Sequence, residues 1–191
     1  VALSEDWRNT GVLDNRLVLQ EIQAGAIPQV LAFRMILMIE TKPWSSSLVE
    51  LLRTFPMAAP MYILAAGPHR HEGLILARSS TITDEVVDIS HGNRWFIVQS
   101  NYEPWSPDNT TDPRRSAAIE TLKQFGPDAA SNPIGLYAVL STYPVHNPNT
   151  IFTSIMRPTV GSIDSFIRSP MCPEDSSELI YPFIDQRYCQ K

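Results

Sequence analysis

The stretch MYILAAGPHRHEGLILARSSTITDEVVDISHGNRWFIVQ, residues 61–99, decides the fold. It contains four short runs of strand-forming residues, separated by turns rich in Gly, Pro, His and Asn. The runs are 61–66, 74–78, 85–89 and 95–99. Because the turns between them are short, we expect antiparallel hairpins. The last run does not alternate cleanly between apolar and polar residues, which predicts a strand that is covered on both faces.

Three helices are expected before this stretch. The first covers about 14–24, and the second opens with a proline and covers 28–39. The second is apolar on almost all sides, so it is either buried in the core, which is the simpler interpretation, or faces a lipid-like ligand. Ser47 and Glu50 match a capping box for a third helix, which ends before Pro56.

A helix with clear boundaries is expected after the strands. Asp112 is its predicted N-cap, Pro113 its first residue and Gly126 its end. A stripe with helical spacing starts at Arg114, so this arginine is expected to point toward the interior. The other members of the stripe are Ala118, Leu122 and Phe125.

The remaining elements complete an α+β fold. A further helix is expected over 133–140, and strands are expected over 150–156 and 162–167. Helices on both sides of a block of antiparallel strands indicate a layered α+β architecture. The length of 191 residues fits one domain, 1–191. Sixteen prolines against eight glycines favour short elements joined by rigid turns.

The composition excludes several classes of protein. Lys and Arg number 15 and Asp and Glu 20, so the net charge is 15 − 20 = −5, and there is no basic block for a nucleic acid. With 43% hydrophobic residues, the chain can form a core. No uncharged apolar run is long enough for a transmembrane span, and VALSEDWR at the start lacks the basic region of a signal peptide.

The cysteines and one glycosylation sequon give a weak indication of compartment. Cys172 and Cys189 are either two free thiols or one disulfide that fixes the C-terminal tail, 169–191. Asn109 begins the sequon Asn-Thr-Thr. Together these features favour an oxidising compartment.

Asn101 and Arg114 are the candidate site residues that the pattern alone suggests. Asn101 follows a predicted strand and Arg114 begins a predicted helix, so the two could meet at one cleft. There an amide N–H could donate to an oxyanion, and a guanidinium could hold a carbonyl or orient a nucleophile. The alternative is that neither residue has a catalytic role. Asn101 would then be a turn residue at the end of a strand, and Arg114 would be a solvated residue in the first turn of a helix.

Four motifs resemble the acid ceramidase and N-acylethanolamine acid amidase family. They are WFIVQSNYEPW (95–105), DPRRSAA (112–118), VLSTYPVHN (139–147) and TIFTSIM (150–156). A weaker match runs through APMYILAAG (59–67). The family consists of N-terminal-nucleophile hydrolases related to penicillin V acylases. The resemblance therefore implies a four-layer αββα sandwich, of which this chain would hold the C-terminal portion.

The resemblance implies amide hydrolysis by an N-terminal cysteine. The thiolate attacks the amide carbonyl, and its own α-amino group acts as base and then acid. By the resemblance, Asn101 supplies an oxyanion-hole donor and Arg114 orients the nucleophile or substrate. It also implies that Cys172 pairs with Cys189.

The chain departs from the family pattern because no residue in it can be the nucleophile. Position 1 is valine, and relatives carry a glutamate where this chain has Trp7, before Arg8. Two explanations stay open. Either another chain or segment supplies the cysteine and its strands to an amidase of ceramide or N-acylethanolamines, or the chain is a catalytically silent accessory subunit.

The remaining expectations follow from the resemblance and from the residue types. A lysosomal or secretory location is implied for an enzyme of this family, with a lipid amide as substrate and peripheral membrane contact compatible with that substrate. No cofactor is expected. His69, His71 and Glu72 form too weak a cluster for a metal site, so no metal is expected.

Overall fold

The computed structural model describes residues 1–8, 20, 23–25, 44–107 and 112–168. The chain divides into two compact units, residues 1–107 with 157–162 and residues 108–156 with 163–191. The helices expected over 14–24 and 28–39, and the expected tail over 169–191, lie outside the described residues. That the two units form one domain stays a prediction.

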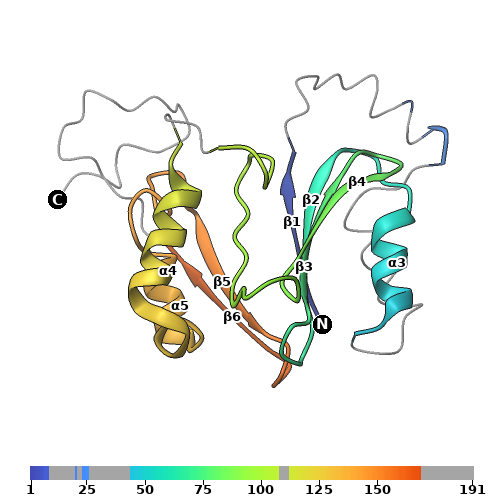
Figure 1. Cartoon of the computed structure of the whole chain (residues 1–191). Helices are drawn as coiled ribbons and strands as arrows, with labels where there is room; N and C mark the ends of the chain where they lie inside the picture. The colour runs from blue at the N-terminus through green and yellow to red at the C-terminus, as the bar shows by residue number, and fades with distance from the viewer. Residues whose placement is uncertain (9–19, 21–22, 26–43, 108–111, 169–191) are drawn as a thin grey trace, which may run out of the picture. The chain divides into compact units, whose positions relative to one another are not determined.

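The first unit contains a four-stranded antiparallel sheet and one helix (Figure 1). The strand order follows the sequence, β1-β2-β3-β4. The elements are β1 (Ala2–Trp7), α3 (Ser46–Thr54), β2 (Met61–Ala66), β3 (Gly73–Arg78) and β4 (Thr83–Asp88). The predicted hairpins over residues 61–89 are therefore confirmed, with shifts of one or two residues at the strand ends.

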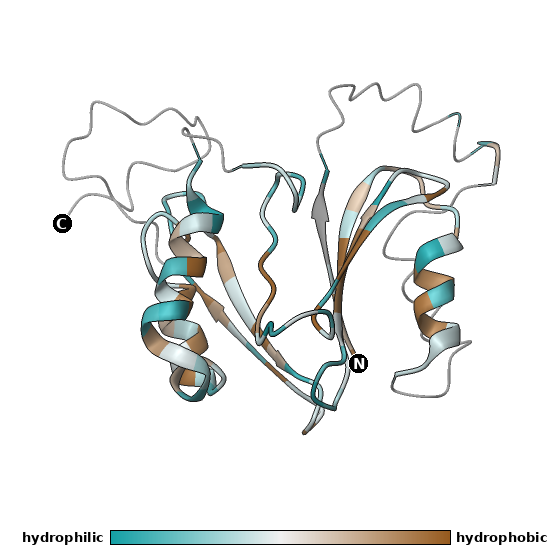
Figure 2. Cartoon of the chain, in the orientation of Figure 1, coloured by the Kyte–Doolittle hydropathy of each residue, from teal (hydrophilic) through white to brown (hydrophobic). Residues whose placement is uncertain are grey.

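The core of the first unit lies between α3 and the sheet. Figure 2 shows hydrophobic residues along β2 and β3, the two central strands. The cluster is formed by Leu48, Leu52, Met57, Met61, Ile63, Ala65, Leu74 and Leu76. Burial of such side chains is the main force that holds the helix on the sheet.

The helix α3 begins earlier than the capping box predicts. Ser45 is the N-cap, and its Oγ accepts a hydrogen bond from the backbone N–H of Leu48 at 3.0 Å. The Ser47 hydroxyl instead contacts the Ser45 hydroxyl at 3.1 Å. The prediction of a Ser47–Glu50 capping box is wrong, because with Ser45 as cap Glu50 lies too far along the helix to reach back.

The strand expected over 95–99 is also wrong. These residues form no strand and are half-buried, not covered on both faces. Trp95 and Phe96 pack edge to face, with ring centroids 4.6 Å apart. Strand propensity is realised only where a neighbouring strand completes the ladder, and no described strand pairs with this segment.

The second unit consists of two helices and most of a two-stranded sheet, whose connecting turn and adjoining strand ends, residues 157–162, belong to the first unit. Its elements are α4 (Arg114–Ala130), α5 (Pro133–Val139), β5 (Phe152–Arg157) and β6 (Ser162–Ile167). Gly126 has φ 74° and ψ 170°, so the first helical segment of α4 ends there, as predicted. The helix over 133–140 and the last two strands are confirmed. Among the described residues, no helix is both long enough and apolar enough to span a membrane.

Candidate functional site

Asn101 lies in a half-buried bend of the first unit, after the segment 95–99. The side-chain amide of Gln99 donates to the carbonyl oxygens of Ser100 and Tyr102, the latter at 2.8 Å. On the other side, the backbone N–H of Ser106 donates to the carbonyl oxygen of Glu103 at 2.9 Å. Hydrogen bonds on both sides therefore restrain the bend that carries Asn101.

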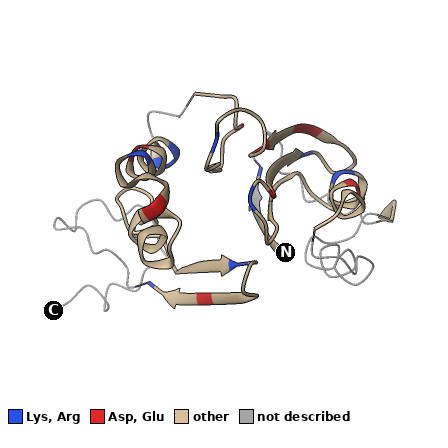
Figure 3. Cartoon of the chain, turned by 60° about the horizontal axis from the view of Figure 1, so that its bottom comes forward, with Lys and Arg blue, Asp and Glu red and all other residues tan. Residues whose placement is uncertain are grey.

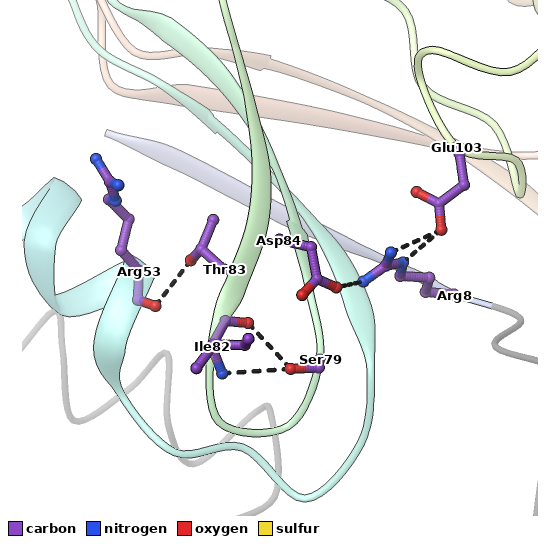
Figure 4. Close-up of polar contacts among 7 residues, drawn as sticks. All are labelled: Arg8, Arg53, Ser79, Ile82, Thr83, Asp84 and Glu103. Carbon is purple, nitrogen blue, oxygen red and sulfur yellow. Dashed lines mark hydrogen bonds and ion pairs between the residues drawn. The ribbon is translucent and has the colours of Figure 1, made fainter.

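A buried arginine connects this bend to the sheet. Arg8 follows β1, its side chain is 8% exposed, and its guanidinium contacts two carboxylates (Figure 4). Nε donates to Glu103 Oε1 at 2.8 Å, and Nη1 donates to Asp84 Oδ2. The guanidinium carbon also lies 5.9 Å from the centroid of the Tyr62 ring, a cation–π distance.

The two carboxylates keep Arg8 charged in spite of its burial. Burial by itself lowers the pKa of Arg8, because it removes water from the guanidinium. The hydrogen bonds and the attraction of Asp84 and Glu103 outweigh this effect, so the net shift of the pKa is upward. The charged form is therefore favoured at every physiological pH.

Sequence reasoning did not find this ion-pair network. Arg8 is 76 residues from Asp84 and 95 residues from Glu103, so no motif contains the three. The family resemblance draws attention to Trp7 and Arg8, but it gives no information about the carboxylates that Arg8 contacts in the fold.

Arg114 is only partly buried in the second unit. Its guanidinium forms a two-point contact with Asp112, from Nε to Oδ1 at 2.6 Å and from Nη2 to Oδ2 at 2.5 Å. The Arg114 side chain is 32% exposed. Its neighbour Arg115 is the buried one, at 6% exposure.

The predicted stripe is confirmed at Ala118 and Leu122, is only partly buried at Arg114, and is wrong at Phe125. The buried face contains Arg115, Ala118, Thr121 and Leu122, whereas Phe125 is 41% exposed.

The predictions of Asp112 as N-cap and Pro113 as first helical residue are each one residue too early, because Pro113 is at the cap position and the helix begins at Arg114. Arg114 therefore stands in the first turn, where its guanidinium binds the carboxylate of the preceding Asp112. Phe125 stands directly before Gly126, where the first helical segment ends.

The predicted site residues fall into three groups. Asn101 belongs to the first unit and Arg114 to the second, and each is described within its own unit. Their meeting at one cleft stays a prediction. Asn109, Cys172 and Cys189 lie outside the described residues, so the sequon and the disulfide also stay predictions.

The first unit also has a cavity of about 240 Å³ near the β2–β3 turn. It is lined by His69, Arg70, His71, Glu72, Ile89, Arg94 and Trp95. The Glu72 carboxylate accepts a hydrogen bond from the backbone N–H of His69 at 2.8 Å, so it supports the turn. Within the part of the chain that the structure describes, no three His, Cys, Asp or Glu side chains are grouped suitably for a metal ion.

Two curated sequences and one solved structure show what the chain is similar to. It is 36% identical over 118 residues to acid ceramidase of Mus musculus, and 32% identical over 118 residues to N-acylethanolamine-hydrolyzing acid amidase of the same species. Each match covers 61% of this chain, but only 29% and 32% of the relatives. The chain thus spans about a third of the length of these relatives. No family model matches.

The structural match is broader. The N-acylethanolamine-hydrolyzing acid amidase ortholog of Caenorhabditis elegans superimposes with a TM-score of 0.71 and 27% sequence identity. The match covers 87% of this chain and 72% of that chain. The expected fold class, α+β with antiparallel sheets of the N-terminal-nucleophile hydrolase type, is confirmed by this match.

Proposed function

We propose that this chain belongs to the family of acid ceramidase and N-acylethanolamine-hydrolyzing acid amidase, and that it is part of an enzyme that hydrolyses N-acyl lipid amides. The substrates would be ceramides or N-acylethanolamines. The enzyme would act in the lysosome or the secretory pathway, where it would meet its lipid substrates at a membrane surface.

The observation that carries the proposal is the sequence match over the middle of the chain. The matches to the two relatives each cover 61% of the chain. Asn101 and Arg114 stand in the sequence motifs WFIVQSNYEPW and DPRRSAA, which resemble the same family. This supports roles for them in amide hydrolysis.

In the proposed mechanism the chain contributes the groups that stabilise charge. A cysteine thiolate from outside this chain attacks the amide carbonyl, and the carbonyl oxygen becomes an oxyanion. The Asn101 carboxamide donates an N–H to that oxygen. Arg114, held by Asp112, orients the nucleophile or the substrate. The amine then leaves with a proton, and water hydrolyses the thioester.

The exposed hairpin of the second unit supports the proposal that further strands come from another chain or segment. A two-stranded sheet is only marginally stable alone. On β5, β6 and the residue before β5, large apolar side chains are exposed: Ile151 at 75%, Phe152 at 64%, Ile163 at 62% and Ile167 at 92%. Figure 3 shows few charged residues on this hairpin. Strands from another chain or segment, which would also carry the nucleophile, could pack against this apolar surface.

The test of the function is the substitution Asn101→Ala in the complete protein, with its nucleophile segment present. Turnover of a fluorescent N-acyl amide is measured by steady-state kinetics. Loss of one oxyanion-hole donor is expected to lower kcat by about 10²- to 10³-fold with little change in KM. Asn93→Ala is the matched control, because Asn93 is exposed in a turn of the same unit.

Two outcomes would contradict the proposal. Unchanged turnover in the Asn101→Ala variant would remove Asn101 from the site. A complete, folded protein that hydrolyses neither ceramides nor N-acylethanolamines would instead support the alternative, a catalytically silent accessory subunit.

A further inference from the structure

The Arg8 network joins three parts of the first unit that are distant in the sequence. Arg8 lies at the end of β1, Asp84 lies in β4, and Glu103 lies beyond the sheet (Figure 4). Nη2 of Arg8 is 2.7 Å from Glu103 Oε1, in addition to the Nε contact. One carboxylate oxygen thus accepts from two guanidinium nitrogens.

The β-sheet fixes the Asp84 side of the network by an irregularity in its register. Ala77 pairs with Glu85 and Arg78 pairs with Thr83, so Asp84 is the extra residue of a bulge. A bulge changes the direction of the side chain on the bulged strand. The Asp84 carboxylate is therefore held toward Arg8 by the backbone of the sheet, independently of the bend that carries Asn101.

Glu103, unlike Asp84, does not lie in a strand. Its contact with Arg8 holds a segment that forms neither a strand nor a helix. Glu103 comes two residues after Asn101, in a segment that forms no strand or helix. The hydrogen bond from Gln99 Nε2 to the Tyr102 carbonyl restrains the bend from within. The contact between Arg8 and Glu103 connects the bend to the residue that follows strand β1 of the sheet.

We propose that Arg8 and Glu103 are positioning residues, whose ion pair holds the Asn101 carboxamide in the orientation needed to bind an oxyanion. The proposal rests on the proposed function of Asn101 and extends it to two residues outside the site. Donors for an oxyanion must be fixed before the reaction, since misplacement by about 1 Å can cost 10²-fold in rate. Arg8 is buried next to the sheet and contacts two carboxylates. It can therefore hold the bend that carries Asn101 in a fixed position.

The chain offers a matched pair of substitutions. Glu103→Gln and Asp84→Asn each replace one of the two carboxylates of Arg8 with an amide of the same shape. Both weaken the same buried ion-pair network, but only Glu103 lies on the segment that carries Asn101. In the complete protein we expect Glu103→Gln to lower kcat about 10-fold at nearly constant KM, while Asp84→Asn leaves kcat within twofold. Glu103→Asp, which keeps the charge, is expected to recover part of the loss.

A second measurement does not depend on turnover. The side-chain amide resonances of Asn101 are assigned in a ¹⁵N-labelled protein by their disappearance in Asn101→Ala. They are expected to shift or broaden in Glu103→Gln and to stay in place in Asp84→Asn. Thermal unfolding of both variants shows whether they are equally folded.

The outcomes separate this inference from the proposed function. If Asn101→Ala keeps full turnover, the proposed function fails. If Asn101→Ala loses turnover while Glu103→Gln and Asp84→Asn have the same kcat, only the positioning role is wrong. Unchanged Asn101 resonances in Glu103→Gln would overturn the positioning role even in a protein without activity.

Discussion

Arg114 and Arg115 are adjacent in the sequence, but the structure gives them opposite environments. Arg114 is paired with Asp112 and is one-third exposed, whereas Arg115 is buried on the face of α4 that also holds Ala118. Arg115→Ala is therefore expected to lower the free energy of unfolding by about 1–3 kcal/mol, through lost packing and unsatisfied partners. Arg114→Ala is expected to change it by less than about 1 kcal/mol.

Urea denaturation of both variants of the purified protein measures this difference. The effects on kcat are expected in the reverse order. Because the proposed role of Arg114 is to orient the nucleophile or substrate, Arg114→Ala should lower kcat more than Arg115→Ala does. Equal loss of stability in the two variants would contradict the burial difference between them.

The sequence suggests candidate site residues only where the residue type fits the chemistry and the residue stands in a family-like motif. Asn101 and Arg114 meet both conditions, and their roles stay predictions. The partial exposure of Arg114 was not predictable, because helical spacing does not reveal the contact of a first-turn side chain with the preceding Asp112 carboxylate. The Arg8 network was not predictable either, since its members are brought together by sheet pairing and a bulge.

At the level of the elements, the end of α3 depends on Arg78 of β3. This arginine is fully buried, and Nη1 donates to the carbonyl oxygens of Leu52 at 2.9 Å and Phe55 at 2.7 Å. Such carbonyls at a helix C-terminus have no partner within the helix. Burial lowers the pKa of Arg78, an effect that the negative charge of Asp84 partly opposes.

We expect Arg78→Ala to lower the free energy of unfolding by about 3 kcal/mol or more. The substitution removes the Arg78 donor from the buried Leu52 carbonyl and the partly buried Phe55 carbonyl, and it opens a cavity beneath the helix. Arg53→Ala is the control, because Arg53 lies exposed in the last turn of the same helix. It should cost no more than about 1 kcal/mol, the usual effect of a basic residue on the helix dipole. Equal unfolding midpoints for the two variants in urea would contradict the capping role.

The elements themselves show what local sequence can and cannot determine. The strands over 61–66 and 74–78 were predictable because strand-forming residues are bounded there by strong turn signals. The segment 95–99 has equally good strand propensity but forms no strand, because a strand also needs a partner. The position of the α3 cap was missed because three consecutive serines are equivalent candidates in the sequence and only the fold selects Ser45.

At the scale of the whole molecule, the surface of the second unit decides how the isolated chain behaves. Tyr137 of α5 packs edge to face against Phe166 of β6, with centroids 5.0 Å apart, so α5 contacts the hairpin at this residue. Arg168 also places its guanidinium carbon 4.5 Å from the Tyr137 ring. The exposed apolar side chains of β5 and β6 remain, and contiguous surfaces of this kind mark interaction sites.

The purified chain is therefore expected to self-associate when its proposed partner strands are missing. Size-exclusion chromatography with light scattering should give a mass above the 21.4 kDa of the chain. The double variant Ile163→Thr/Ile167→Thr keeps β-branched residues in or at the end of β6 but removes apolar surface, so it should shift the protein toward the monomer. Ile82→Thr is the control, because Ile82 is 60% exposed in the turn before β4 of the other unit, and its removal should leave the association unchanged. A wild-type chain that stays monomeric at high micromolar concentration and binds no hydrophobic dye would show that the hairpin needs no partner, and the argument for externally supplied strands would lose its structural support.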